Sequence, residues 1–138
     1  MNKLTTNYNG IEEPIQEALS FLGIDGITVT IGRNDRLLDR LAPPDIELEA
    51  LTTETYIPDT YNMFFRGGKP SLRALAHEMI HLDQLVRGDL KMDLKTGKAW
   101  WNGEEYDNSV AYNDRPWEKE AFNKQNEIYK IIRHGNSK

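Results

Sequence analysis

Apolar residues recur at steps of three and four in three stretches of the chain, which is the spacing of an amphipathic helix. Residues 11–22 place isoleucine, alanine and leucine on one side and glutamates opposite, and Gly23 follows as a stop. Residues 71–87 carry a second apolar stripe between a serine start and Gly88. Pro116 begins a third stretch that runs to about Arg133, because proline suits the first position of a helix. The pattern predicts three helices.

Shorter segments between these helices alternate apolar and polar residues, which is typical of half-buried strands. Residues 27–31, 46–50 and 61–65 show this alternation, with a turn region over 53–59. They predict a small antiparallel sheet that precedes the second helix, and residues 34–41 form either a helical turn or a loop. Turn signals within 91–106 predict a hairpin or irregular meander, whose two tryptophans are expected to pack against the helices rather than line a cleft. The fold class is therefore α+β.

The chain has 138 residues, which is the size of one domain with a substantial core. Residues 1–10 and 134–138 are polar and are expected to be loose tails. The formal net charge of −5, without a cluster of lysine and arginine, argues against a nucleic-acid or anionic-membrane surface. Cysteine is absent, so any metal ligands must be histidine, aspartate or glutamate.

The first twenty residues contain several glutamates and no long apolar core, so we expect no signal peptide. No apolar run approaches the ~18 residues of a membrane-spanning helix. These patterns predict a soluble cytoplasmic protein, or a virion-associated one if a phage encodes it. The oligomeric state does not follow from the sequence.

The second predicted helix contains His77-Glu78-Met79-Ile80-His81, a His-Glu-x-x-His motif. At about 100° per residue, His77 and His81 lie one turn apart on the same face, where two imidazoles can hold one metal ion. Glu78 is the next residue around the helix, close enough to polarise a metal-bound water. This is the arrangement of metal-assisted hydrolysis, with Glu78 as general base.

Chance is a poor explanation of this motif. A chain of this length contains the pattern at random roughly once in a few hundred sequences. The chain has three histidines, and two of them stand at this spacing. The alternative is an ordinary surface or core helix that happens to carry two histidines.

A catalytic zinc usually has three protein ligands, so two histidines leave one ligand to be found. His134 lies near a polar terminus, which disfavours it, and the third helix offers Glu118, Glu120 and Glu127. Periodicity places Glu118 on the inward side and Glu120 on the solvated side. An inward carboxylate in the first turn of a helix is explained by a bound cation; the alternative is a favourable interaction with the helix dipole.

The His-Glu-Met-x-His run, the nearby Gln84 and the later run Pro-Trp-Glu-Lys-Glu-Ala-Phe (residues 116–122) resemble the gluzincin metallopeptidases. In that group a glutamate on a later helix completes the motif. The resemblance covers roughly residues 77–129 and is nearest to short SprT-like and phage-encoded metallopeptidases. It implies a minimal zincin-like domain, a Zn²⁺ ion on His77, His81 and Glu118, and Glu78 as general base. The extra histidine of metzincins and the cysteine ribbon of longer SprT-type proteins are absent.

The expected reaction is hydrolysis of a protein or peptide substrate. Tyr112 is the first candidate for stabilising the oxyanion, ahead of Tyr106 and Arg115, and Gln84 is either an orienting residue on the histidine face or an ordinary polar residue. The strand 61–65 is expected to pair with an extended peptide. Two alternatives remain: a metal-containing structural or binding component, for example of a phage particle, and a regulatory protease that cuts one partner such as a repressor.

Overall fold

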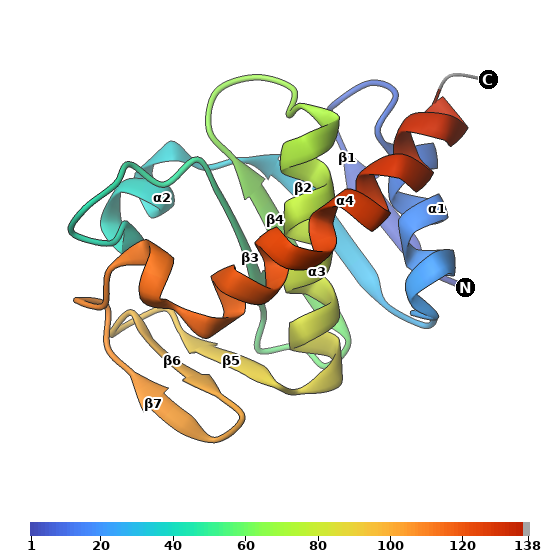
Figure 1. Ribbon diagram of the computed structural model, residues 1–138. Helices are drawn as coiled ribbons and strands as arrows, with labels where there is room; N and C mark the ends of the chain where they lie inside the picture. Colours follow the sequence, from blue (N-terminus) through green and yellow to red (C-terminus); the bar gives the residue numbers. More distant parts are fainter. Residues whose placement is uncertain (137–138) are drawn as a thin grey trace.

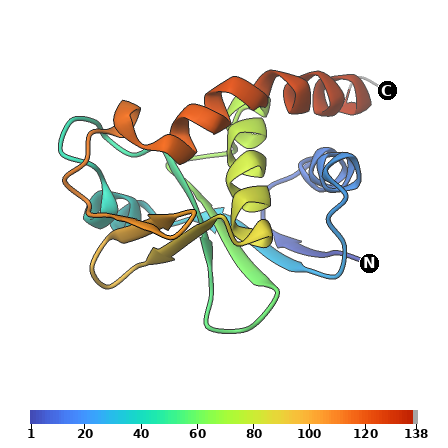
Figure 2. The same cartoon turned by 60° about the horizontal axis from the view of Figure 1, so that its bottom comes forward.

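The computed structural model describes the backbone of residues 1–136 and the side chains of residues 1–133. The main sheet has four strands in the order β1-β2-β4-β3. Their bounds are β1 (Lys3–Thr6), β2 (Thr28–Arg33), β3 (Ala50–Glu54) and β4 (Thr60–Phe65). Three long helices lie on the same side of this sheet (Figures 1 and 2): α1 (Glu12–Leu22), α3 (Leu72–Arg87) and α4 (Pro116–Asn136). The fold class is α+β, as predicted.

The main sheet is mixed rather than antiparallel, so that part of the prediction is wrong. β1 pairs with β2 in parallel, β2 pairs with β4 in parallel, and only β3 and β4 are antiparallel. The cause is connectivity: α1 carries the chain back over the sheet, and a strand that follows such a crossover runs parallel to the strand before it.

The first ten residues do not form a loose tail, because Lys3–Thr6 is the edge strand β1. Its single apolar residue, Leu4, offers little alternation to detect. At the other end, α4 continues to Asn136, beyond the predicted stop near Arg133. Of the predicted tail at 134–138, residues 137–138 and the side chain of His134 lie outside the described residues.

The predicted strand at 46–50 is displaced. The observed strand is Ala50–Glu54, and it includes residues assigned to a turn. Thr52 and Thr53 are buried, which fits the strand preference of β-branched residues but produces no apolar alternation. The strand predicted at 61–65 is confirmed as β4, yet it lies between β2 and β3. It therefore has no free edge for a peptide, and its neighbour β3 is the edge strand on this side of the sheet.

The helix boundaries follow the expected capping signals. Ser71 accepts a hydrogen bond from the backbone N–H of Ala74 (3.1 Å) and begins α3, while Gly88 ends it with a left-handed φ of 82°. The ambiguous segment 34–41 is the short helix α2 (Asp35–Leu41), capped by Asn34. No helix in the described part of the chain has the length and apolar character needed to cross a bilayer.

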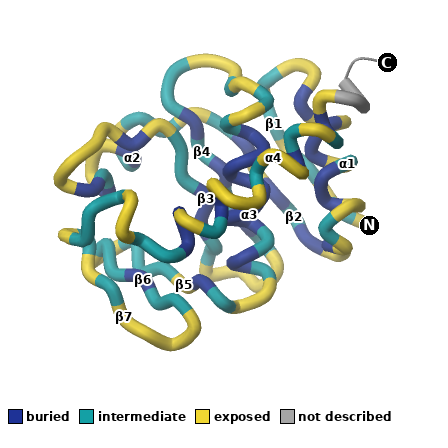
Figure 3. The backbone as a smooth tube through the Cα atoms, viewed as in Figure 1, coloured by how far each residue is buried: buried dark blue, intermediate teal, exposed yellow. Residues whose placement is uncertain are grey.

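The predicted meander is a separate three-stranded antiparallel sheet made of β5 (Leu90–Asp93), β6 (Lys98–Trp101) and β7 (Glu104–Tyr106). Trp101 packs against the main core, as expected, and the core itself lies between the sheet and the three helices (Figure 3). α3 is buried along most of its length, because the sheet lies on one side of it and α4 on another. Polar side chains on α3 are thus forced into the interior, where they need partners.

Candidate metal centre

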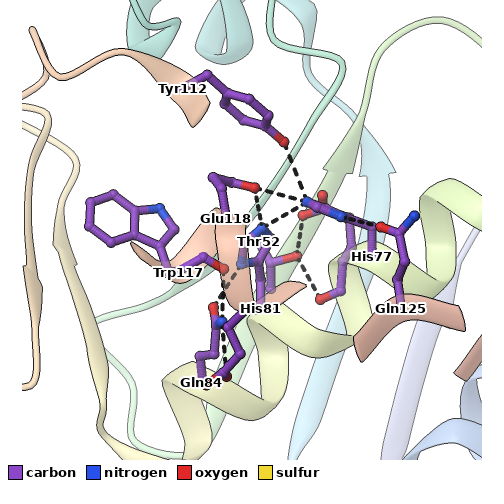
Figure 4. A network of polar contacts seen from close by, with 10 residues as sticks. Thr52, His77, His81, Gln84, Tyr112, Trp117, Glu118 and Gln125 are labelled. Carbon is purple, nitrogen blue, oxygen red and sulfur yellow. Dashed lines mark hydrogen bonds and ion pairs between the residues drawn. The ribbon is translucent and has the colours of Figure 1, made fainter. Parts of the chain in front are cut away.

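His77 and His81 point their Nε2 atoms at the same place (Figure 4). The two atoms are 3.2 Å apart, and both side chains are buried, with residue exposures of 8% and 5%. The rings stand nearly perpendicular, at an interplanar angle of 81°. One helical turn of separation on α3 therefore produces the convergence that the motif predicted.

Glu118 from the first turn of α4 completes this group. Its Oε1 lies 2.9 Å from His77 Nε2 and 3.0 Å from His81 Nε2. Glu120 turns elsewhere and pairs with Arg87 at 2.7 Å, and Glu127 is exposed. Of the three carboxylates considered from the sequence, the structure brings Glu118 to the histidines.

Two glutamine amides fix the orientation of the imidazoles. Gln84 Oε1 lies 2.8 Å from His81 Nδ1, and Gln125 Oε1 lies 2.6 Å from His77 Nδ1. The amide NH₂ of Gln84 donates to the Trp117 carbonyl (2.9 Å), so its oxygen must face His81. An amide oxygen only accepts, so each Nδ1 carries a proton, and each Nε2 is the ring atom left to bind a metal ion or a further proton.

Two lone pairs and a carboxylate oxygen repel one another at 3 Å unless a proton or a cation lies between them. Burial alone would lower the pKa of His81, but the Glu118 carboxylate raises it to about 10. Burial alone would raise the pKa of Glu118, but His81 and His77 hold it well below its usual range. In the absence of a metal, the group therefore binds a proton.

The spacing also fits a metal ion. Ligand atoms bonded to one tetrahedral zinc lie about 3.3 Å apart, close to the 2.9–3.2 Å between the three atoms here. Imidazole nitrogens and a carboxylate oxygen are the donors that zinc and similar divalent ions take when cysteine is absent. His77, Glu78 and His81, whose possible ligand atoms lie within 4.8 Å of one another, form a buried group that could hold a metal ion.

Glu78 lies beside this group without joining it as closely as Glu118. Its Oε1 accepts a hydrogen bond from the Thr52 hydroxyl (2.8 Å), and both side chains are buried. Burial raises the pKa of the Glu78 carboxyl above its usual range, while the histidines and Thr52 act in the opposite direction. A carboxyl whose pKa is raised by burial and lowered by its neighbours can both accept and return a proton.

Tyr112 is the nearest of the three oxyanion candidates. Its hydroxyl lies 3.4 Å from His77 Nε2, and burial raises its pKa well above the usual range, so it remains a donor. Arg115 instead donates from Nε to the Val110 carbonyl (3.0 Å) and from Nη2 to Asn108. Tyr106 packs its ring against Trp117, with ring centroids 5.3 Å apart.

Thr52 and Gln125 were missed by sequence reasoning. Gln125 follows Glu118 by seven positions, almost two helical turns, so the face shared with Glu118 was an available signal. Thr52 had no such signal, because it lies on a strand whose position was predicted wrongly. Gln84 likewise follows His77 by seven positions, and this spacing was the signal for it. Its bond to His81 is an orienting contact, one of the two roles considered from the sequence.

Two pockets meet at the candidate centre, and Glu78 and Tyr112 line both. The first has a volume of about 40 Å³, room for one or two water molecules, and includes His81 and Glu118. Its remaining walls are largely apolar and include Leu48, Leu90, Met92, Ala99 and Trp117. The second lies on the other side, between the segment before β3 and the start of α3, and Phe122 lines it.

The edge strand β3 borders the first pocket, and half of its backbone groups point away from β4. The Glu49 carbonyl accepts from Arg66 N–H (2.8 Å) and Thr55 N–H donates to the Thr60 carbonyl (3.1 Å). Hydrogen-bonded pairs alternate in an antiparallel ladder, so residues 51 and 53 also face β4 and residues 50, 52 and 54 face away from it. Ala50 and Glu54 are half-buried, whereas Thr52 is only 2% exposed and its backbone is covered.

No family model, no curated protein and no solved structure matches the chain. The geometry of the centre is therefore the basis on which a function can be assigned.

Proposed function

We propose that this chain is a zinc-dependent metallopeptidase of the gluzincin kind, with His77, His81 and Glu118 as ligands and Glu78 as general base. The supporting observation is the convergence of two imidazole Nε2 atoms and one carboxylate oxygen, within 2.9–3.2 Å of one another, beside a second buried carboxyl. A structural charge pair alone needs neither a second imidazole nor an adjacent buried glutamate.

A zinc ion at this place would supply Lewis acidity, lowering the pKa of a coordinated water toward ~7 and polarising a peptide carbonyl. Glu78 would take the proton released by the attacking water and return it to the leaving amine. The Tyr112 hydroxyl would donate to the oxyanion that develops on the carbonyl oxygen. The two glutamines would hold the imidazoles in the tautomer that leaves Nε2 free.

We propose that the substrate is an extended peptide that adds to the edge strand β3. The main-chain groups of Ala50 and Glu54 would pair with it, and this pairing is independent of sequence. The first pocket lies next to Glu78, has room for one or two water molecules and has largely apolar walls, so a substrate side chain that enters it would be small and apolar. A segment that is already extended or unfolded fits this surface better than a folded one.

A second candidate is a structural metal site, and one observation favours it: the three ligand atoms join α3 to α4. An ion at such a junction stabilises the folded state even without catalysis. The two functions make different predictions for Glu78, because only the hydrolytic one uses its carboxylate as a base.

The test combines metal analysis with one substitution. Purified protein is expected to contain about one zinc per chain, and quenched fluorescent peptides are expected to be cleaved. Glu78→Gln keeps the shape of the side chain and removes the base, so zinc content should persist while cleavage falls by 10²–10⁴-fold, the usual range for general base catalysis. Glu127→Gln, an exposed change on α4, is the matched control. Stoichiometric zinc without cleavage in the wild type would support the structural site.

A further inference from the structure

Thr52 is the side chain that holds the proposed base. Its hydroxyl donates to Glu78 Oε1 at 2.8 Å, and it is buried between the sheet and α3. Among the described residues, it is the only side chain that donates a hydrogen bond to this carboxylate. Figure 4 draws the hydrogen bond from Thr52 as a dashed line.

A hydrogen bond to Oε1 alone leaves the other oxygen of the Glu78 carboxylate available. Glu78 lines both pockets, so the oxygen that does not bind Thr52 can accept a hydrogen bond from a water there. A carboxylate attached to a backbone at one end and bonded through one oxygen at the other cannot rotate freely. The bond therefore fixes the direction from which the second oxygen approaches a reacting group.

Thr52 also lies on the edge strand β3. Its side chain faces the helices, since it pairs with buried Met63 across the sheet. The half-buried residues two positions before and after it, Ala50 and Glu54, direct their backbone N–H and C=O groups away from β4. A peptide that pairs with these two residues would thus pass the residue whose hydroxyl holds the base.

We propose that Thr52 is a positioning residue: it orients the Glu78 carboxylate toward a peptide bond that is held along the same edge strand. The inference rests on the proposed peptidase function and deepens it, because it names the residue that directs the base toward the substrate.

The neighbouring threonine offers a matched control. Thr53 is completely buried (0% exposed), and its hydroxyl has no hydrogen-bond partner among the described residues. It pairs with Asn62 on the opposite face of the sheet from Glu78. Thr53→Val therefore makes the same chemical change one residue away, without touching the base.

The experiment compares zinc-loaded wild type with Thr52→Val, Thr52→Ala, Thr52→Ser and Thr53→Val, using a library of quenched fluorescent decapeptides. Zinc content and melting temperature are measured for each protein. We expect Thr52→Val and Thr52→Ala to lower kcat by about 100-fold, the effect of misplacing a reacting group by about 1 Å. KM and zinc content should stay close to wild type. Thr52→Ser should restore most of kcat, and Thr53→Val should match wild type.

The outcomes separate the two proposals. An active wild type whose kcat is unchanged in Thr52→Val or Thr52→Ala overturns the role of Thr52 and leaves the peptidase function standing. A loss that Thr52→Ser does not rescue, or that Thr53→Val reproduces, also overturns it, since the effect is then one of packing. A zinc-loaded wild type that cleaves no peptide overturns the peptidase function, and the role of Thr52 with it. If Thr52→Val does not fold, Thr52→Ala and Thr52→Ser still decide the question.

Discussion

His77 on α3 and Glu118 on α4 are 41 positions apart in the chain, and their side chains meet at 2.9 Å. Each belongs to a different helix, and the crossing of these two helices is what assembles the candidate centre. The strength of metal binding should therefore depend on the Glu118 carboxylate as much as on the histidine motif.

Glu118→Gln tests this dependence. The amide keeps the size of the side chain but loses its negative charge, and it places an NH₂ group or a weaker oxygen donor at the site. We expect zinc affinity to fall by more than about 100-fold, beyond the 10–100-fold loss typical of an outer hydrogen-bonding partner. Competition with a chromogenic chelator measures it. Glu127→Gln on the same helix should bind zinc like the wild type, and equal affinity in the two variants would contradict the assignment.

The two glutamines should differ in importance. Gln84 is fully buried and bonds to both His81 and the Trp117 carbonyl, whereas Gln125 is half-buried. Gln84→Ala is expected to lower zinc affinity by 10–100-fold and to destabilise the metal-free protein by roughly 1–3 kcal/mol, because buried polar groups lose their partners. Gln125→Ala should lower zinc affinity and stability by less, since water can replace the amide oxygen at this half-buried position. Chelator competition and urea unfolding measure the two effects, and a larger loss for Gln125 would contradict this ranking.

Zinc uptake should release protons. The Glu118 carboxylate raises the pKa of His81 to about 10 in the metal-free protein, so His81 is protonated at pH 7 and must lose that proton to bind a metal. We expect release of about one proton per zinc and an affinity that rises about tenfold per pH unit between pH 7 and 9. Calorimetry in buffers of different ionisation enthalpy counts the protons. Zero release at pH 7 would show that His81 is already neutral.

The stability of the metal-free protein should decline at alkaline pH. His81 has a pKa of 6.5 when exposed and about 10 in the fold, so the folded state binds its proton more tightly. The resulting stabilisation is complete below pH 6.5 and is lost as the pH rises through 10. Urea unfolding in the presence of a chelator, at pH 6 and pH 10, measures the decline. A His81→Asn variant should show a smaller decline, and an equal one would assign the effect to other groups.

Metal should raise the melting temperature, because an ion held by α3 and α4 binds the folded state alone. At a free zinc concentration 100 times the dissociation constant, the free energy of unfolding increases by about 2.7 kcal/mol. Calorimetric scans with and without zinc measure it, with His77→Ala as the variant that should not respond. A wild type whose melting does not change would contradict the bridging arrangement.

Local periodicity was sufficient to predict the parts of the centre that lie on helices. The spacing of His77 and His81 and the inward side of α4 are properties of a helix of known pitch, and packing preserved them. The same helical periodicity distinguished the inward Glu118 from Glu120. The inward side predicted for Glu118 was right, although Phe122, four residues later, lines the second pocket and is 48% exposed.

The sheet was less predictable because its order depends on contacts between distant segments. The parallel pairing of β1 and β2 follows from the path of α1 over the sheet, which no local pattern in Lys3–Thr6 reveals. β3 was misplaced because threonines replace apolar residues at its buried positions. One of them, Thr52, donates a hydrogen bond to Glu78, and a pairing across 26 positions becomes visible only in three dimensions.

Gln84 bonds at once to an imidazole of α3 and to a carbonyl of α4, so the ligand set cannot be complete before the last helix has docked. On the ribosome, a growing chain would expose both histidines before α4 is synthesised. Under the proposed function, such a chain would hold an incomplete ligand set and would not hydrolyse peptide bonds in its own unfolded segments until α4 had formed and docked.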